Sequence, residues 1–156
     1  MGERLMASPA ISNDYYVQRH ESPVVDAATG VQRAPWTDAV GRALRRLQEL
    51  PPGWDSYGGH RIQERAVYSA VNILSAIAAD PHLPQPSIVP TSVGGIQIEW
   101  HRLGVDLELE ISPSGSSFEM FVSEGAVVRE LSLSNNLAPF AAEVRRLADR
   151  EAQAVR

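Results

Sequence analysis

Glu99, His101 and Asp106 are the residues of this sequence best suited to metal or acid–base chemistry. Carboxylate oxygens and an imidazole nitrogen that converge on one surface can hold Mg²⁺ or Mn²⁺. No helical histidine pair or other diagnostic ligand spacing accompanies the three residues, and an exposed histidine–aspartate pair on neighbouring strands accounts for them equally. Both interpretations stay open, and the sequence predicts no bound cofactor.

A second candidate site is the glycine-rich loop from Gly53 to His60, whose polar and aromatic members include Trp54, Asp55, Tyr57 and His60. The loop lacks the lysine of a phosphate-binding loop, and Ser56 lacks the flanking glycines of a nucleophile elbow. In a structural interpretation the glycines permit unusual backbone angles, Trp54 and Tyr57 anchor the loop on the core, and Asp55 caps a turn. Ligand binding by the loop is the alternative.

Composition excludes several classes of chemistry. The chain has no cysteine, which excludes a disulfide framework, a thiolate nucleophile and a cysteine-based zinc site. All fourteen basic residues are arginine, so Schiff-base chemistry on a lysine is excluded too. An isoelectric point near 5.3 and the lack of a nucleic-acid-binding motif argue against a DNA or RNA partner.

The chain is expected to be a cytoplasmic protein that does not associate with membranes. Its first residues contain no apolar run long enough for a signal-peptide core, and no apolar stretch is long enough to span a membrane. A length of 156 residues suits one domain. We expect residues 1–35 to be a disordered or loosely docked arm, residues 36–150 a single α+β domain, and residues 151–156 a frayed tail.

Apolar residues at three- and four-residue spacing predict helices on both sides of a central β region. The first begins near Thr37 and ends before Pro51, because proline cannot continue a helix. The second runs from about Gln63 to Ala79. A C-terminal helix opens at Asn135-Asn136 and carries Pro139 in its first turn, where proline is tolerated.

From Ile88 the apolar period changes to two, which predicts strands. Regular turn signals divide this region into five strands, at residues 88–93, 96–102, 105–112, 117–123 and 126–133. Pro90 is tolerated if the first strand lies at an edge of the sheet. The predicted fold class is α+β, with two N-terminal helices, a five-stranded antiparallel meander sheet and a C-terminal helix.

Loop lengths predict the register of this sheet, because directly opposed residues point to the same face. The hairpin turns oppose one glutamate to another on each pair of neighbouring strands after the first pair: Glu99 to Glu108, Glu110 to Glu119, and Glu119 to Glu130. The last pairing assumes that Glu124 and Gly125 form the turn. One face of the sheet is then apolar and is expected to lie under the helices.

The opposite face, called the acidic face below, carries Glu99, Asp106, Glu108, Glu110, Glu119 and Glu130, with His101 at one end and Phe121 in the middle. Residues 88–134 contain seven acidic residues and two arginines, a net charge of −5 that equals the formal net charge of the whole chain. Antiparallel sheets commonly leave one polar face in water. A face that binds a basic partner and a metal or catalytic site are the alternatives, and the apolar Phe121 and Val128 on this face favour a contact surface.

Two segments together resemble a group of short uncharacterised bacterial proteins. The first is Leu50-Pro51-Pro52-Gly53-Trp54-Asp55-Ser56-Tyr57-Gly58-Gly59, and the second is Gly94-Gly95-Ile96-Gln97-Ile98-Glu99-Trp100. The resemblance covers roughly residues 37–123 and leaves the N-terminal arm outside. It implies a bacterial origin and a structural role for the loop and the hairpin, but no activity.

The function expected from these observations is that of a non-enzymatic interaction module. A small acidic protein of this kind binds a basic protein partner through the acidic face, as antitoxins, immunity proteins and inhibitors do. The expected contact residues are Glu99, Glu108, Glu110, Glu119, Phe121 and Glu130. The alternative is a metal-dependent hydrolase or nuclease-like enzyme that uses the same carboxylates, so whether the protein is an enzyme stays open.

Overall fold

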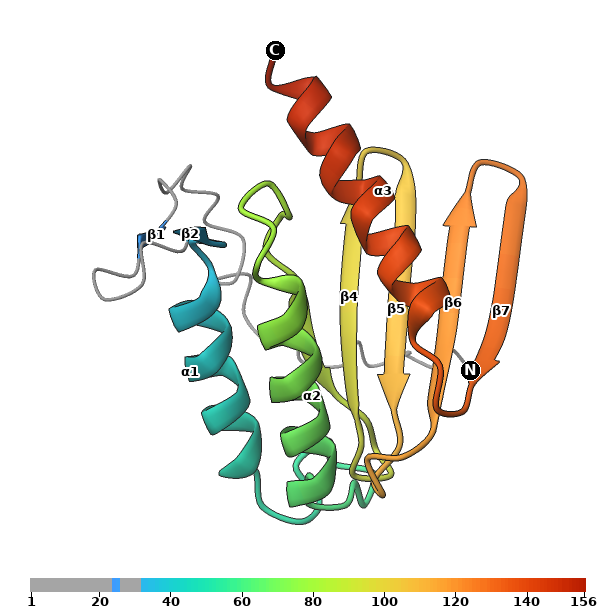
Figure 1. The fold of residues 1–156 in the computed structure, drawn as a ribbon. Helices are drawn as coiled ribbons and strands as arrows, with labels where there is room; N and C mark the ends of the chain where they lie inside the picture. The colour runs from blue at the N-terminus through green and yellow to red at the C-terminus, as the bar shows by residue number, and fades with distance from the viewer. Residues whose placement is uncertain (1–23, 26–31) are drawn as a thin grey trace, which may run out of the picture.

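A five-stranded antiparallel sheet carries the six carboxylates of the acidic face, and helices lie on one side of it (Figure 1). This computed structural model describes residues 24–25 and 32–156, so most of the predicted N-terminal arm lies outside the described residues. The α+β class, the antiparallel sheet and the C-terminal helix are confirmed.

The sheet is a meander in which each strand pairs with the next along the chain: β3 (Ser87–Pro90), β4 (Ile96–Arg102), β5 (Val105–Ile111), β6 (Phe118–Glu124) and β7 (Val127–Leu133). Burial alternates along β4 and β5, because successive side chains of a strand point to opposite faces. Pro90 lies on the edge strand β3, as its missing N–H group requires.

The register of two hairpins is as predicted, and that of the third is not. Glu99 pairs with Glu108, and Glu110 pairs with Glu119. On β6 and β7, however, Glu119 faces Ser132, so the predicted Glu119–Glu130 pair is wrong. The turn consists of residues 125–126, and of these only the glycine has a positive φ, as in a type II′ turn. The shift is two residues, so every side chain stays on its predicted face.

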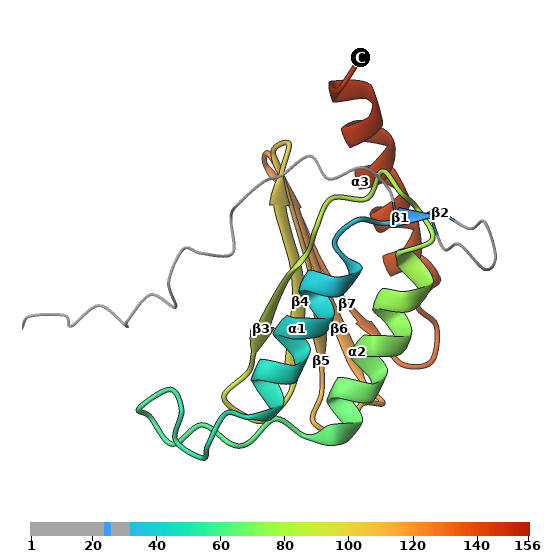
Figure 2. The same ribbon diagram turned by 90° about the vertical axis from the view of Figure 1, so that its left-hand side faces the viewer.

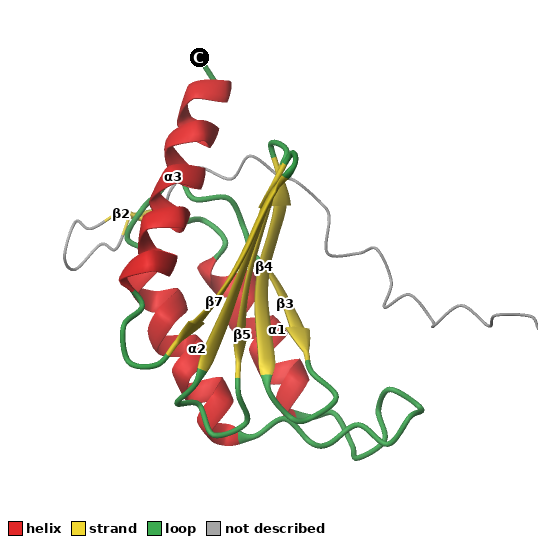
Figure 3. Ribbon diagram, turned by 90° about the vertical axis from the view of Figure 1, so that its right-hand side faces the viewer, coloured by secondary structure: helices red, strands yellow, loops and turns green. Residues whose placement is uncertain are grey.

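Three helices cover the apolar face of the sheet: α1 (Thr37–Gln48), α2 (Glu64–Ile77) and α3 (Ala138–Ala154). Figures 2 and 3 view the sheet nearly edge-on, with the helices on one side of it. α3 continues past residue 150, where the sequence predicts a frayed tail. Glu151 helps to hold this last turn, because its Oε1 pairs with Nη2 of Arg102 on β4 at 2.6 Å.

The packed part of the chain begins slightly before the predicted domain boundary. Two short strands, β1 (Val24–Val25) and β2 (Gln32–Arg33), pair with each other. Ala34 follows β2, is fully buried, and donates its N–H to the carbonyl of Ala78 at 2.8 Å. Ala34 therefore belongs to the packed core, two residues before the predicted start of the domain at residue 36.

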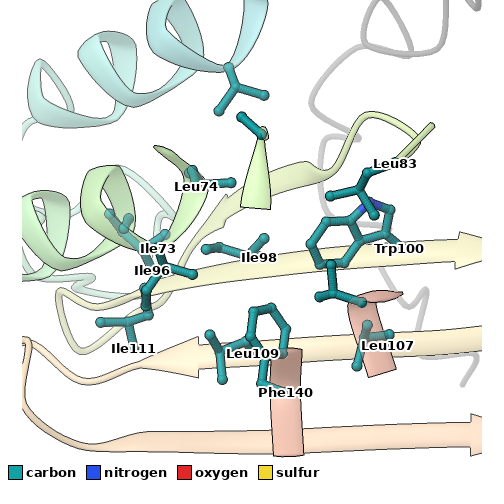
Figure 4. Close-up of a cluster of buried hydrophobic side chains, with 14 of the residues drawn as sticks. Ile73, Leu74, Leu83, Ile96, Ile98, Trp100, Leu107, Leu109, Ile111 and Phe140 are labelled. Atoms are coloured by element: carbon teal, nitrogen blue, oxygen red, sulfur yellow. The ribbon is translucent and has the colours of Figure 1, made fainter. Parts of the chain in front are cut away.

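Two buried tryptophans tie the proline-rich connection between α2 and β3 to the core. The indole N–H of Trp36 donates to the carbonyl of Leu83, and that of Trp100 donates to the carbonyl of Pro84, each at 2.8 Å. The ring centroids of Trp100 and of Phe140 on α3 lie 6.2 Å apart, in the cluster drawn in Figure 4. Buried tryptophans normally need a partner for this N–H, and both have one.

Candidate functional site: the acidic face

The acidic face is the side of the sheet that points away from α1, α2 and α3. Strand pairing puts all six predicted carboxylates on it, together with His101, Phe121 and Val128. Across the middle of the sheet, Glu99, Glu108, Phe121 and Glu130 form one row, each opposite the next. Because of the two-residue shift between β6 and β7, Glu130 lies opposite Phe121 and not opposite Glu119 as predicted.

Charge is separated across the sheet. The two arginines of the five-stranded sheet, Arg102 and Arg129, point to the helix side and pair there with acids of α3. Arg102 contacts Glu151 at 2.6 Å, and Arg129 contacts Glu143 at 2.5 Å. Glu124, the one acid of the described strands on the helix side, pairs with two arginines of α3. Charges are therefore balanced where the sheet meets α3, whereas the acidic face carries no arginine from any described strand.

Glu99 and Glu108 share one hydrogen-bond donor. Nε2 of Gln97 donates to Oε2 of Glu99 at 2.9 Å and to Oε2 of Glu108 at 3.0 Å. Partial burial and the charge of Glu99 raise the pKa of Glu108. The sequence analysis identifies both glutamates but misses this role of Gln97. The alternation that puts Gln97 on the same face as the glutamates was the signal for it.

His101 is held between two carboxylates. Its Nδ1 lies 2.9 Å from Oδ1 of Asp106, directly opposite on β5, and its Nε2 lies 3.6 Å from Oε2 of Glu99. A carboxylate can only accept, so Nδ1 carries the proton of this hydrogen bond. Partial burial favours the neutral ring, but the hydrogen bond to Asp106 and the charges of Glu99 and Asp106 outweigh burial and raise the pKa of His101.

Glu99, His101 and Glu108 lie close enough together for their side chains to hold one metal ion. Each offers one ligand atom, and the three atoms lie within 4.8 Å of one another. The sequence hypothesis names Asp106 as a ligand, but Glu108 takes that place in the structure. Asp106 instead orients His101 through Nδ1 and leaves Nε2 for a metal, which is the usual arrangement of a metal-binding histidine.

The acidic face also has an apolar component. Phe121 is half-buried between Glu108 on β5 and Glu130 on β7. Val128 on the same face is 60% exposed. Aromatic residues are enriched at protein–protein interfaces and carboxylates are depleted there, so Phe121 is the feature of this face that favours a contact surface.

The Gly53–His60 loop is held together by its own hydrogen bonds. Oδ1 of Asp55 accepts from the backbone N–H groups of Tyr57 at 2.9 Å and Gly59 at 2.8 Å, and these two bonds lower the pKa of Asp55. The indole N–H of Trp54 donates to the carbonyl of His60 at 3.1 Å. The predicted turn-capping role of Asp55 therefore fits these contacts.

Tyr57 does not anchor this loop. Its side chain is 81% exposed, whereas Trp54 is half-buried, so the expectation that both rings pack on the core is wrong for Tyr57. Tyr57 directly follows Ser56, which has a positive φ of 65°. This backbone turn and the Asp55 cap direct the tyrosine outward, an effect that composition alone does not reveal. The backbone N–H of His60 joins the loop to the carbonyl of Ser92, before β4.

Comparison with known proteins adds no family to this geometry. None of the described helices is long and apolar enough to cross a membrane. The chain matches no protein-family model, no curated protein and no solved structure.

Proposed function

We propose that this protein is a non-enzymatic interaction module that binds a basic protein partner through the acidic face, as antitoxins, immunity proteins and inhibitors do. The observation that carries the proposal is the separation of charge across the sheet. Both arginines of the five-stranded sheet are paired on the helix side, so the six carboxylates of the acidic face have no arginine of this sheet beside them. Basic side chains of a partner would supply the missing positive charge.

Phe121 and Val128 add an apolar component to the acidic face. Interfaces have apolar, often aromatic residues at their centre and polar residues at the rim. Phe121 lies within the row of Glu99, Glu108 and Glu130, so a partner that covers it would also meet these carboxylates. The ring would contribute to the lifetime of the complex, and the charges would contribute to its rate of formation.

The setting that we propose is the cytoplasm, since a chain without cysteine gives no sign of an oxidising compartment. The negative charge concentrated on one side of the sheet would steer a basic protein towards it. Such steering raises association rates at low salt and is lost as salt screens the charges. A fast association rate that depends on salt is therefore the kinetic signature expected of the complex.

Protein capture with a matched pair of variants tests this proposal. The face variant changes Glu99, Glu108, Glu110 and Glu119 to glutamine. The control variant changes Asp38, Glu49, Glu64 and Asp149, all exposed and on helices or their ends, to asparagine or glutamine. Each removes four negative charges from a formal net charge of −5. Wild type and control should retain a basic protein that the face variant does not. If no protein distinguishes the face variant from the control, the proposal is wrong.

A metal-dependent hydrolase or nuclease-like enzyme is the second candidate, and one observation favours it. Glu99, His101 and Glu108 bring three ligand atoms within 4.8 Å of one another. Mg²⁺ or Mn²⁺ bound by so few side chains would keep water molecules, one of which could act as the nucleophile in hydrolysis.

Calorimetric titration with Mn²⁺ and with Mg²⁺ separates the two candidates. A metal site should bind Mn²⁺ and raise the melting temperature by mass action. Glu108→Gln and His101→Asn should each abolish that shift, and Glu130→Gln, on the same face but outside the cluster, should keep it. A wild type that is indifferent to both cations rules out the enzyme candidate and leaves the interaction module untouched.

A further inference from the structure

β7 leaves one of its edges without a partner. It is the last strand of the sheet and pairs with β6, and no backbone group within the described ranges bonds to its other side. The N–H and C=O groups of alternate residues in a strand point away from the paired neighbour. Val127, Val128, Arg129 and Glu130 are all exposed. The edge therefore offers free hydrogen-bonding groups to an added strand.

β7 lacks most of the features that normally prevent strand addition. Edge strands are usually short, bulged, interrupted by proline, covered or charged, and of these β7 has only its two charged side chains, Arg129 and Glu130. β7 is seven residues long, has no proline, and pairs with β6 in continuous register along its whole length. The opposite edge strand, β3, has four residues, ends at Pro90 and lies beside α1. The two edge strands of the sheet thus differ, and the longer one, β7, is the one without a pairing partner on its outer side.

The open edge borders the acidic face. Glu130 lies in the middle of β7 on that face, opposite Phe121. A strand added beside β7 would place one side chain directly across from Glu130, where an opposite charge is favourable. On the helix side the same strand would meet Val127 and Leu131, which are apolar. Arg129 on that side is already paired with Glu143.

We infer that the partner docks by adding an extended segment to the free edge of β7, with basic side chains on the acidic face and apolar side chains on the helix side. This inference rests on the proposed function and states how the partner is held. Hydrogen bonds to the β7 backbone provide affinity, and Glu130 with the neighbouring carboxylates selects for arginine or lysine.

In its longest register, a second copy of this chain fits the edge poorly. Two β7 strands related by a twofold axis pair antiparallel, and the register that uses all seven residues puts Glu130 opposite its own copy. A register shifted so that Arg129 lies at the centre pairs that arginine with itself. Like charges directly opposed destabilise a sheet. A partner of the opposite charge avoids this repulsion.

The probe for this inference is a blocked seven-residue peptide of alternating valine and arginine. Two further peptides carry N-methyl groups, one on all valines and the other on all arginines. An added strand bonds through one of its edges only, so one methylated peptide should bind roughly 100-fold more weakly than the parent and the other should bind as the parent does. Glu130→Gln should weaken binding of the parent about threefold.

Amide hydrogen exchange, read residue by residue by NMR, locates the peptide. Alternate N–H groups of β7 should become protected when the peptide binds, and those of β3 should not. The inference is overturned if both methylated peptides bind like the parent, if both fail, if the parent does not bind, or if β7 stays unprotected. It is also overturned if sedimentation shows a dimer that protects β7 without peptide. Capture of a basic protein by wild type but not by the face variant would, in each case, leave the proposed function standing.

Discussion

Glu99 and Glu108 face each other on β4 and β5, and the amide of Gln97 donates a hydrogen bond to both carboxylates, at 2.9 and 3.0 Å. Opposed like charges destabilise an antiparallel pair by a fraction of a kcal/mol up to about 1 kcal/mol. The shared amide offsets part of this repulsion, and partial burial together with the charge of Glu99 raises the pKa of Glu108. The sheet thus keeps its charge at a cost in stability, as expected of a surface that uses the charge for binding.

Gln97→Ala should lower the free energy of unfolding at pH 7 by about 1 kcal/mol, because both carboxylates lose their shared donor. Urea unfolding of wild type and variant provides the measurement. In the Glu99→Gln/Glu108→Gln background, where the charges are absent, the same substitution should cost clearly less. An equal cost in both backgrounds would show that the side chain of Gln97 matters only for packing.

Stability should also depend on the protonation of His101. Its pKa is raised in the folded protein, so its contribution is fully present below the unfolded value of about 6.5 and is lost as the pH rises through the folded value. The free energy of unfolding should therefore fall as the pH rises above about 6.5 in the wild type, and less so in His101→Asn.

Asp106→Asn provides the matched test, because it keeps a side chain of the same shape opposite His101 but removes the charge. NMR titration of the imidazole should give a lower pKa in this variant than in the wild type. An unchanged pKa would mean that Asp106 does not control the protonation of His101 and would remove the reason for assigning it an orienting role.

Trp54→Ala should destabilise the protein by about 1–2 kcal/mol, less than the 3–5 kcal/mol typical of a fully buried aromatic residue, since the ring is half-buried. Tyr57→Ala, in the same loop but exposed, should change stability by less than about 0.5 kcal/mol. Thermal unfolding of the two variants measures both losses of stability. Similar losses for both would contradict the distinction between an anchoring tryptophan and a free tyrosine.

The acidic face could be predicted from the sequence because the two-residue period of a strand determines which face of the sheet each side chain points to. Alternation from Ile96 to Ile111 has no interruption apart from the Leu103-Gly104 turn, and both turn residues have a positive φ. The β6–β7 pairing could not be predicted, because Glu124-Gly125 and Gly125-Ala126 are both reasonable turns. In the structure the turn is residues 125–126, with glycine at the first position as in a type II′ turn.

Contacts that depend on side-chain direction could not be predicted from the sequence. The outward position of Tyr57 follows from hydrogen bonds of Asp55 to the backbone and from the positive φ of Ser56. Likewise, the three ligand atoms that lie close together belong to Glu99, His101 and Glu108, whereas Asp106 forms a hydrogen bond with Nδ1 of His101. Residue type and strand register place these groups on one face but do not say which atoms meet.

The most direct test of binding through the acidic face is the association rate of the captured basic protein, measured by stopped flow over a series of salt concentrations. The face variant should associate at least tenfold more slowly than wild type at low salt, with little dependence on salt, and should dissociate at a similar rate. Its melting temperature should be equal to or above that of the wild type, because the Glu99–Glu108 and Glu110–Glu119 repulsions are relieved. The control variant, with the same net charge, should associate nearly as fast as the wild type. Equal slowing of both variants, or of neither, would contradict binding through the acidic face.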